Sequence, residues 1–265
     1  MSLVSGKVLI TGATGGIGQA IARAFGSRGA SLLLTGRRTE ALEPLVDEFG
    51  ARVLACDLAE RESVARLIEE AADVDVLVAN AALPASGHIT ELTQGQIDTM
   101  LEVNLRAPIA LARGLLPGMA ERGRGHLVFV SSLSGKVASG RSSLYNATKF
   151  GLRGFSLAVR EDLREAGVGA SVVLPGFISD AGMFADAGVE LPRGVSTRTP
   201  QQVAAAVLDA VEHDRAEVSV APLSLRLGAS FASVAPAAAA RFARLAGGDR
   251  VARDLAAGQT DKRPA

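Results

Sequence analysis

The chain has 265 residues, its 28 acidic side chains balance 28 basic ones, and 48% of its residues are apolar. This composition predicts a soluble globular protein and excludes the basic stripe expected of a protein that follows a nucleic-acid backbone. The single cysteine, Cys56, excludes an internal disulfide. Because we find neither a signal-peptide pattern nor an apolar run long enough to cross a membrane, we expect a cytoplasmic protein.

Apolar runs typical of strands alternate with segments of helical periodicity along the chain. Strands are expected at residues 7–11, 31–35, 52–56, 75–80, 126–132, 170–175 and 217–222. Helices are expected at 16–28, 39–49, 60–72, 108–122, 143–166 and 223–245, with two more that begin after Thr93 and Thr199. This alternation predicts an α/β fold, a single Rossmann-type doubly wound parallel sheet of about seven strands with helices on both faces.

The sequence contains no linker rich in Pro, Gly or Ser, so we expect one domain over residues 1–246. Within it, residues 177–198 form a loop long enough to be a lid. Residues 223–245 are alanine-rich and are expected to form one helix. Residues 247–265 are polar and are expected to be a flexible tail.

A glycine-rich stretch, TGATGGIG at residues 11–18, follows the first strand and opens the first helix. Gly12 permits a tight turn, and Gly16 and Gly18 allow a pyrophosphate to approach the free N–H groups of the helix N-terminus. The alternative is a flexible turn that needs glycine only for its backbone angles. The strand before it and the helix after it favour dinucleotide binding.

The only tyrosine in the chain, Tyr145, precedes Lys149 by four residues within one predicted helix. The two side chains therefore face the same side. An ammonium group about 4 Å from a phenol in a partly shielded site is worth about 4 kcal/mol, enough to lower the phenol pKa by up to about three units. Burial acts in the opposite direction. A Tyr-x-x-x-Lys pair alone is a weak signal, because many helices carry one by chance.

With TGATGGIG, Tyr145 and Lys149 together, the chain resembles the short-chain dehydrogenase/reductase family over about residues 6–220. The resemblance implies an enzyme that interconverts a carbonyl and an alcohol by direct hydride transfer, with Tyr145 as general acid and base. It also implies that Ser132 hydrogen-bonds the substrate oxygen and that Asn104 holds a water connected to Lys149. Ser131 and Ser134 compete for the serine role, but the Ser-x-x-Gly pattern of residues 132–135 favours Ser132.

The two arginines after the second predicted strand bear on the choice of cofactor. Gly36 stands where an acidic residue would select NAD, and Arg37 and Arg38 follow it. A guanidinium group can bind a 2′-phosphate through two parallel hydrogen bonds, so we expect NADP (NADPH). The alternative is that both arginines belong to a solvated loop.

Three further segments match the family in part. Asp57 is expected near the adenine, unless it only caps a helix; Asn80 matches in ANAA, where the family has NNAG; and Asp180 stands at a position usually held by threonine, so Ser179 or the Ile178 backbone would replace it. The expected cofactor contacts are Gly12, Thr14, Gly15, Gly16, Ile17, Gly18, Arg37, Arg38, Asp57, Leu58, Asn80, Ala81, Tyr145, Lys149, Pro175, Gly176 and Ile178.

Substrate and assembly are less constrained. The apolar residues of the 177–198 loop either form a pocket for a lipophilic ketone, aldehyde or secondary alcohol, or pack the loop onto the body. The helix at 223–245 could cover the pocket, mediate a subunit contact or lie on a membrane surface. In the family the helices around 108–122 and 143–166 form the dimer interface, which implies a homodimer or homotetramer. The three histidines show no metal-ligand spacing, so no metal is expected.

Two other readings remain open. An NADP-binding sensor or scaffold without turnover would be indicated by a broken catalytic set, whereas Ser132, Tyr145 and Lys149 are all present. An NADP-dependent epimerase or dehydratase of the longer branch of the superfamily is disfavoured by the short chain and by the Gly-x-x-x-Gly-x-Gly spacing.

Overall fold

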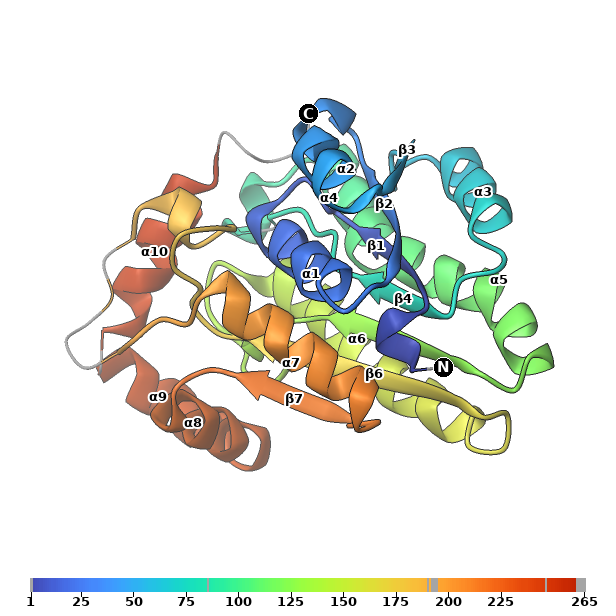
Figure 1. Cartoon of the computed structure of the whole chain (residues 1–265). Coiled ribbons are helices and arrows are strands. Elements are labelled where there is room, and N and C mark those ends of the chain that lie inside the picture. Colours follow the sequence, from blue (N-terminus) through green and yellow to red (C-terminus); the bar gives the residue numbers. More distant parts are fainter. Residues whose placement is uncertain (1, 85, 190, 192–194, 246, 261–265) are drawn as a thin grey trace.

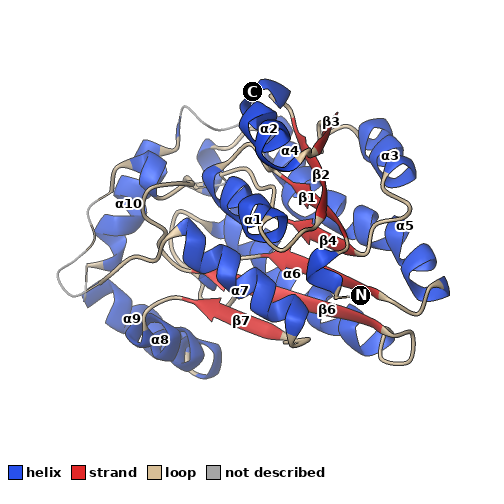
Figure 2. Cartoon of the chain, viewed as in Figure 1, coloured by secondary structure: helices blue, strands red, loops and turns tan. Residues whose placement is uncertain are grey.

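A computed structural model describes residues 2–84, 86–189, 191, 195–245 and 247–260. Seven parallel strands form one sheet in the order β3-β2-β1-β4-β5-β6-β7 (Figure 2). The prediction of a seven-stranded doubly wound parallel sheet is thereby confirmed. The strands are β1 (Lys7–Thr11), β2 (Ser31–Gly36), β3 (Arg52–Ala55), β4 (Val76–Ala79), β5 (Gly125–Val130), β6 (Val168–Pro175) and β7 (Glu217–Val220).

Helices cover both faces of this sheet (Figure 1). One face packs against α1 (Gly16–Gly26), α2 (Glu43–Phe49) and α7 (Pro200–Glu212). The other packs against α3 (Arg61–Glu70), α5 (Ala107–Glu121) and α6 (Ser143–Asp162). Near α6, α4 (Gln94–Leu101) contributes Met100 to a small cluster with Leu144.

The alternating direction of the side chains along β1 accounts for the two hydrophobic layers. Successive side chains of a strand point to opposite faces. Ile10 therefore packs with Ile21 and Val207 on one side, whereas Leu9 packs with Leu67 and Leu111 on the other. A strand buried on both faces is apolar at most positions, which is why these runs are nearly continuous.

The strand order reverses beside β1. β1 pairs with β2 on one side and with β4 on the other, so the connections leaving β1 and β4 diverge at their carboxyl ends. In sheets of this kind that point forms a crevice in which ligands bind. The segments that follow β1, β4 and β5 are therefore the natural place to look for a site.

The two predicted helix starts are confirmed. Thr93 caps α4, because its hydroxyl accepts a hydrogen bond from the Gln96 backbone N–H at 3.2 Å. Thr199 caps α7 in the same way, accepting from the Gln202 backbone N–H at 3.3 Å. Each glutamine side chain returns a bond to the backbone of its threonine, which completes a capping box.

The carboxyl-terminal part differs from the prediction in two ways. Instead of one helix at 223–245 there are two, α8 (Leu223–Val234) and α9 (Pro236–Leu245). Pro236 has no backbone N–H to donate and begins the second helix, which explains the break.

The tail is the second difference. Within residues 247–265, which we expected to be flexible, residues Gly248–Gly258 form a helix, α10. It is held to the lid, because the Gln259 side chain is buried and donates to the Met183 carbonyl at 3.3 Å. Residues 261–265 lie outside the described residues. Among those that are described, no helix is long and apolar enough to cross a membrane.

Candidate active site

The glycine loop between β1 and α1 is closely packed. Gly12 has a φ of +64°, and a Cβ there would lie 2.7 Å from the Ala81 Cα. A Cβ on Gly18 would lie 2.3 Å from the Gly12 carbonyl oxygen. Only glycine therefore fits at either position. The loop ends at Gly15, which is the N-cap of α1, so the free N–H groups of the helix lie at the carboxyl edge of the sheet.

Asn80 and Thr11 fasten this loop to the end of β4. The Asn80 side-chain amide donates to the carbonyls of Thr11 and Gly12 at 3.1 and 3.2 Å. In return, the Thr11 hydroxyl accepts from the backbone N–H groups of Asn80 and Ala81 at 3.1 and 3.2 Å. Asn80 was predicted, whereas Thr11 was not; the available signal was a hydroxyl at the end of an otherwise apolar strand.

Another glycine, Gly36, makes a close contact at the end of β2. A Cβ on Gly36 would lie 2.6 Å from the Thr14 methyl group, so this strand end lies directly against the glycine loop. Arg37 and Arg38 follow on the surface, and neither forms an ion pair with any described residue. Both guanidinium groups are therefore free to bind an anion near the loop.

Asp57 and Leu58 follow β3. The Asp57 carboxylate accepts from the Ala59 backbone N–H at 3.0 Å, which closes a turn, and Leu58 is buried. Asp57 is not a helix N-cap, because α3 begins at Arg61 with Glu60 as its N-cap. The helix-capping role that was considered for Asp57 from the sequence is therefore wrong, and its carboxylate stabilises a local turn instead.

Together these features fit a dinucleotide. Small residues keep side chains out of the loop, the helix N-terminus offers N–H donors, and two unpaired cations lie beside the end of β2. The loop residues that were predicted to contact the cofactor lie in this part of the structure; they are Gly12, Thr14, Gly15, Gly16, Ile17 and Gly18.

The structure brings Ser132, Tyr145 and Lys149 together although they come from two elements. Ser132 follows β5, and the other two lie one turn apart on α6. The Ser132 hydroxyl lies close enough to the Tyr145 phenol to lower its pKa, and it donates to the Pro175 carbonyl at 3.5 Å. The Lys149 ammonium group lies 5.6 Å from the centre of the Tyr145 ring and donates to the Val130 carbonyl at 3.2 Å.

Three neighbouring serines were considered for the hydrogen bond to the substrate oxygen, and their contacts in the structure differ. Ser131 is buried, and its hydroxyl donates to the Lys149 carbonyl at 3.0 Å, which joins β5 to α6. Ser132 is partly exposed, contacts Tyr145 and accepts from the Ser134 N–H at 3.1 Å. Of the three, Ser132 is the one that lies against the phenol.

Burial dominates the electrostatics of this cluster. It raises the pKa of Tyr145 to about 12, although the nearby Ser132 hydroxyl acts in the opposite direction. It also lowers the pKa of Lys149 to about 8. The sequence-based expectation of a lowered phenol pKa is therefore not met in this structure, because desolvation has the largest effect on it. The phenol is neutral near pH 7 and can donate a proton.

Asn104 lies in an unusual helical segment. Residues Glu102–Arg106 form a π-helical turn that joins α4 to α5. The fully buried Asn104 side chain accepts from the Leu83 N–H at 2.7 Å and donates to the Leu83 carbonyl at 2.9 Å. It thereby ties the segment after β4 to this turn. Such π-turns are frequent at functional sites.

Asn146 is a residue that sequence reasoning missed. Its buried side chain donates to the carbonyls of Ser134 and Val137, each at 2.7 Å, and accepts from the Ser139 N–H at 3.2 Å. The loop after Ser132 is thus held to α6 beside Tyr145. No local pattern indicates this role, because the partners lie seven to twelve residues earlier in the chain.

The segment after β6 lies against the glycine loop. Ile178 forms a parallel bridge with Arg198, in which the Ser179 N–H donates to the Arg198 carbonyl at 2.8 Å. Asp180 has a φ of +64° and accepts from the Ser179 hydroxyl at 2.9 Å. A Cβ on Gly16 would lie 2.3 Å from the Ala181 Cβ.

The lid is apolar beyond this point. The rings of Phe177 and Phe184 have centroids 4.9 Å apart. Met183 is held by α10, as described above. Residues 190 and 192–194 of the predicted lid lie outside the described residues. These contacts show that the lid packs on itself and on α10, without excluding a pocket beneath it.

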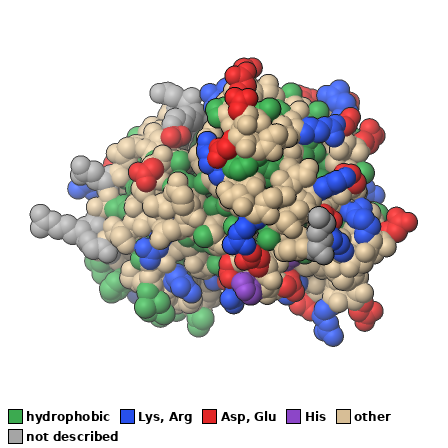
Figure 3. Space-filling view, in the orientation of Figure 1, with side chains coloured by type: hydrophobic (Ala, Val, Ile, Leu, Met, Phe, Trp, Pro, Cys, Tyr) green, Lys and Arg blue, Asp and Glu red, His purple; other side chains and the backbone are tan. Residues whose placement is uncertain are grey.

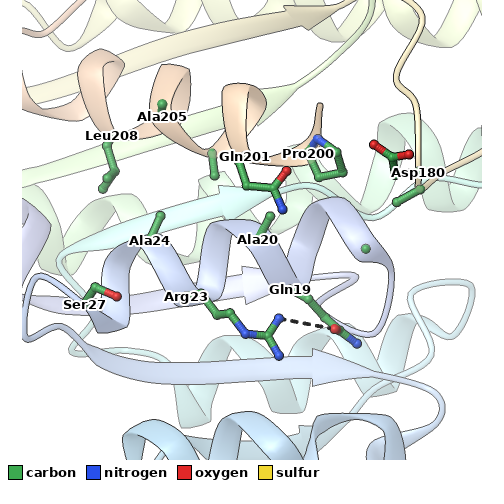
Figure 4. Close-up of a pocket in the computed structure, with 13 residues that line it drawn as sticks. Gln19, Ala20, Arg23, Ala24, Ser27, Asp180, Pro200, Gln201, Ala205 and Leu208 are labelled. Atoms are coloured by element: carbon green, nitrogen blue, oxygen red, sulfur yellow. Dashed lines mark hydrogen bonds between the residues drawn. The ribbon is translucent and has the colours of Figure 1, made fainter. Parts of the chain in front are cut away.

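A groove of about 550 Å³ lies between α1 and α7, with Asp180 and Pro200 at one end (Figure 4). Gly16 is also among the residues that line it. Gln19 and Arg23 of α1 border it and are hydrogen-bonded to each other at 3.5 Å. None of Ser132, Tyr145 and Lys149 lines this groove. It is therefore a neighbour of the glycine loop and not the catalytic pocket.

Comparison with known proteins decides the family. The model of the family described as "short chain dehydrogenase" matches residues 6–190. The chain belongs to this family. As a short-chain dehydrogenase/reductase it is an oxidoreductase that depends on NAD(P).

Three relatives illustrate the family membership. The chain is 35% identical over 230 residues to a ketoacyl reductase, HetN, of Nostoc sp., covering 83% of this chain and 80% of that protein. It is 39% identical over 182 residues to YdfG of Salmonella typhi, an NADP-dependent 3-hydroxy acid dehydrogenase, covering 64% and 72%. The structure of a serine dehydrogenase complexed with NADP+ matches with a TM-score of 0.74 and 29% identity, covering 82% of this chain and 95% of that one.

Proposed function

We propose that the protein is an NADPH-dependent reductase of lipophilic ketones or aldehydes that also oxidises the corresponding alcohols. The observation that carries the proposal is the contact of Ser132 with the Tyr145 phenol above the Lys149 ammonium group. A bound nicotinamide would supply or accept the hydride. The residues of the chain would then handle the substrate oxygen and its proton.

In reduction, Ser132 and Tyr145 would donate hydrogen bonds to the carbonyl oxygen, which polarises it. The neutral Tyr145 phenol would then deliver its proton to that oxygen as negative charge develops. Lys149 lies beneath the ring and would stabilise the resulting phenolate by its positive charge. Asn104 would hold a water that carries a replacement proton toward Lys149.

Preference for NADP rests on Arg37 and Arg38. Both are exposed, and neither has an ion-pair partner among the described residues. Gly36 offers no carboxylate that would repel a 2′-phosphate. The serine dehydrogenase complexed with NADP+ and the NADP-dependent YdfG enzyme are consistent with this preference.

Contacts of the remaining predicted residues follow from the same placement. Asn80 and Ala81 would lie beside the adenosine, near Asp57 and Leu58. On the nicotinamide side, Ile178 is the candidate, because the bridge to Arg198 uses the Ser179 N–H and leaves the Ile178 N–H on the opposite side of the strand. Pro175 ends β6, and Gly176, whose N–H donates to the Val220 carbonyl at 3.0 Å, leads from the strand toward Ile178.

Substrate class and assembly complete the proposal. The Phe177 and Phe184 rings of the lid favour a lipophilic substrate. The names of the ketoacyl reductase and the 3-hydroxy acid dehydrogenase support a carbonyl or alcohol as the reacting group. An apolar groove between α5 and α6, lined by Leu116 and Phe155, supports a homodimer or homotetramer. Sedimentation equilibrium of the purified protein distinguishes these from a monomer.

We also place the protein in the cytoplasm.

The decisive experiment is steady-state reduction of a panel of ketones and aldehydes with NADPH. We expect turnover by the wild-type protein, and a loss of roughly 10²–10⁴-fold in kcat for Tyr145→Phe with NADPH affinity within a few-fold. Ser132→Ala should also lose activity, whereas the matched control Ser134→Ala should not. An NADPH-binding protein that turns over no carbonyl would instead support the sensor or scaffold alternative.

A further inference from the structure

The two helices that follow β7 carry an apolar surface that the fold does not use. We call α8 and α9 the C-terminal hairpin. It lies beyond β7, the last strand at one edge of the sheet (Figure 1). Within α8 only Ala229 and Ala232 are buried, and α9 buries no described residue. The hairpin thus contributes little to the core of the domain.

Its large apolar side chains point outward. They are between 53% and 88% exposed, and they make up most of the strongly exposed large hydrophobic residues of the described chain. In the space-filling view, hydrophobic side chains gather at the corner of the molecule that α8 and α9 occupy (Figure 3). They are Leu223, Leu227, Phe231 and Val234 of α8 and Phe242 and Leu245 of α9.

The spacing within α8 makes this a continuous stripe. The four residues of α8 recur at intervals of four, four and three, which places them on one side of the helix. The buried Ala229 and Ala232 lie on the opposite side. An exposed apolar stripe of this length costs solubility and marks an interaction surface.

The charges beside the stripe have a single sign. Residues 218–248 contain three arginines and no aspartate or glutamate. Arg226, Arg241 and Arg244 form no ion pair with any described residue. An apolar face flanked by unpaired cations is the pattern of a helix that lies in a membrane interface and attracts anionic lipids.

We propose that the C-terminal hairpin docks the enzyme on the surface of an anionic phospholipid bilayer. The apolar stripe would insert at the level of the acyl-chain boundary, and the three arginines would face the lipid phosphates. A second copy of the chain fits less well. A symmetric interface would bring the same arginines of both subunits together with no carboxylate from the hairpin to neutralise them.

The test uses the full-length protein and sedimentation with vesicles of phosphatidylcholine alone or mixed with phosphatidylglycerol. We expect partition into the mixed vesicles, weakened by salt, and little binding to phosphatidylcholine alone. Leu227→Ser with Phe231→Ser should lower the partition coefficient at least about tenfold. Arg241→Gln with Arg244→Gln should lower it by about fivefold for each arginine.

Matched controls lie elsewhere on the surface. Val46→Ser removes an exposed apolar residue of α2, and Arg66→Gln with Arg164→Gln removes two exposed cations that form no ion pair with any described residue; neither variant should change partition. The proposal is overturned if anionic vesicles do not bind the protein, or if the hairpin variants bind like the wild type. It is also overturned if Leu227→Ser with Phe231→Ser lowers the oligomeric mass in the absence of lipid, because the stripe would then be a subunit contact. Sedimentation needs no turnover, so its outcome is independent of the proposed reaction.

Discussion

The Lys149 ammonium group lies 5.6 Å from the centre of the Tyr145 ring and is held there by the Val130 carbonyl at the end of β5. The cation is therefore positioned by the sheet and not only by its place on α6. Burial lowers its pKa to about 8 while it raises that of Tyr145 to about 12. These two shifts make the activity of the proposed enzyme dependent on pH.

Carbonyl reduction should slow at alkaline pH. Lys149 is charged below its pKa of about 8 and loses its charge above it. Since the charge stabilises the phenolate left by proton transfer, kcat/KM for reduction should fall about tenfold per pH unit above that value. A pH–rate profile measures this. Lys149→Met should remove most of the activity, and the activity that remains should no longer fall above pH 8. A wild-type profile that stays flat well above pH 8 would contradict the role assigned to Lys149.

Arg37→Ala with Arg38→Ala should change cofactor preference. The loss of charge-assisted hydrogen bonds to a 2′-phosphate should weaken NADPH binding roughly 10–100-fold, whereas NADH binding should stay within a few-fold. Fluorescence titration with both cofactors measures the two dissociation constants. Arg66→Ala, on the exposed surface of α3, is the control. Equal weakening of both cofactors would argue against recognition of the 2′-phosphate.

Asn146 should act as a positioning residue for Ser132 and Tyr145. Asn146→Ala removes the hydrogen bonds to Ser134, Val137 and Ser139, leaving polar groups unpaired at a cost of about 1–3 kcal/mol each if they stay buried. Well below Tm, kcat should still fall at least about tenfold while KM for NADPH changes little. A lower Tm with an unchanged kcat would show that Asn146 only stabilises the loop.

His126 should make the stability of the fold depend on pH. It is buried and hydrogen-bonded to the Ser171 hydroxyl at 2.7 Å. Burial lowers its pKa from 6.5 to about 4, which outweighs the opposite effect of Asp214. Between these values the unfolded chain binds a proton that the folded protein resists, so the free energy of unfolding falls as pH decreases. The fall should be about 2 kcal/mol from pH 7 to pH 5.

Urea unfolding at several pH values measures this dependence. In His126→Gln the slope between pH 5 and pH 7 should be reduced by the amount attributed to His126, whatever the stability of the variant at pH 7. The slope is the relevant quantity, because glutamine can also change packing around Ser171. An unchanged slope would show that another group is responsible.

Much of this protein could be predicted from local sequence patterns. The strands were visible because strands buried on both faces are apolar at most positions. Thr93 and Thr199 marked helix starts because each cap bonds to a residue three positions later. Tyr145 and Lys149 could be paired because a helix fixes the direction of residues four apart.

What depended on contacts between distant segments was decided only by the tertiary structure. The bond from Ser131 to α6, the loop held by Asn146 and the packing of α10 on the lid involve partners that no local sequence pattern relates. The pKa of Tyr145 was mispredicted for the same reason, since a charge four residues away can be read from the chain but the burial that raises the phenol pKa cannot. Likewise, the chain shows that α8 is amphipathic, but only the fold shows that its apolar stripe is left exposed.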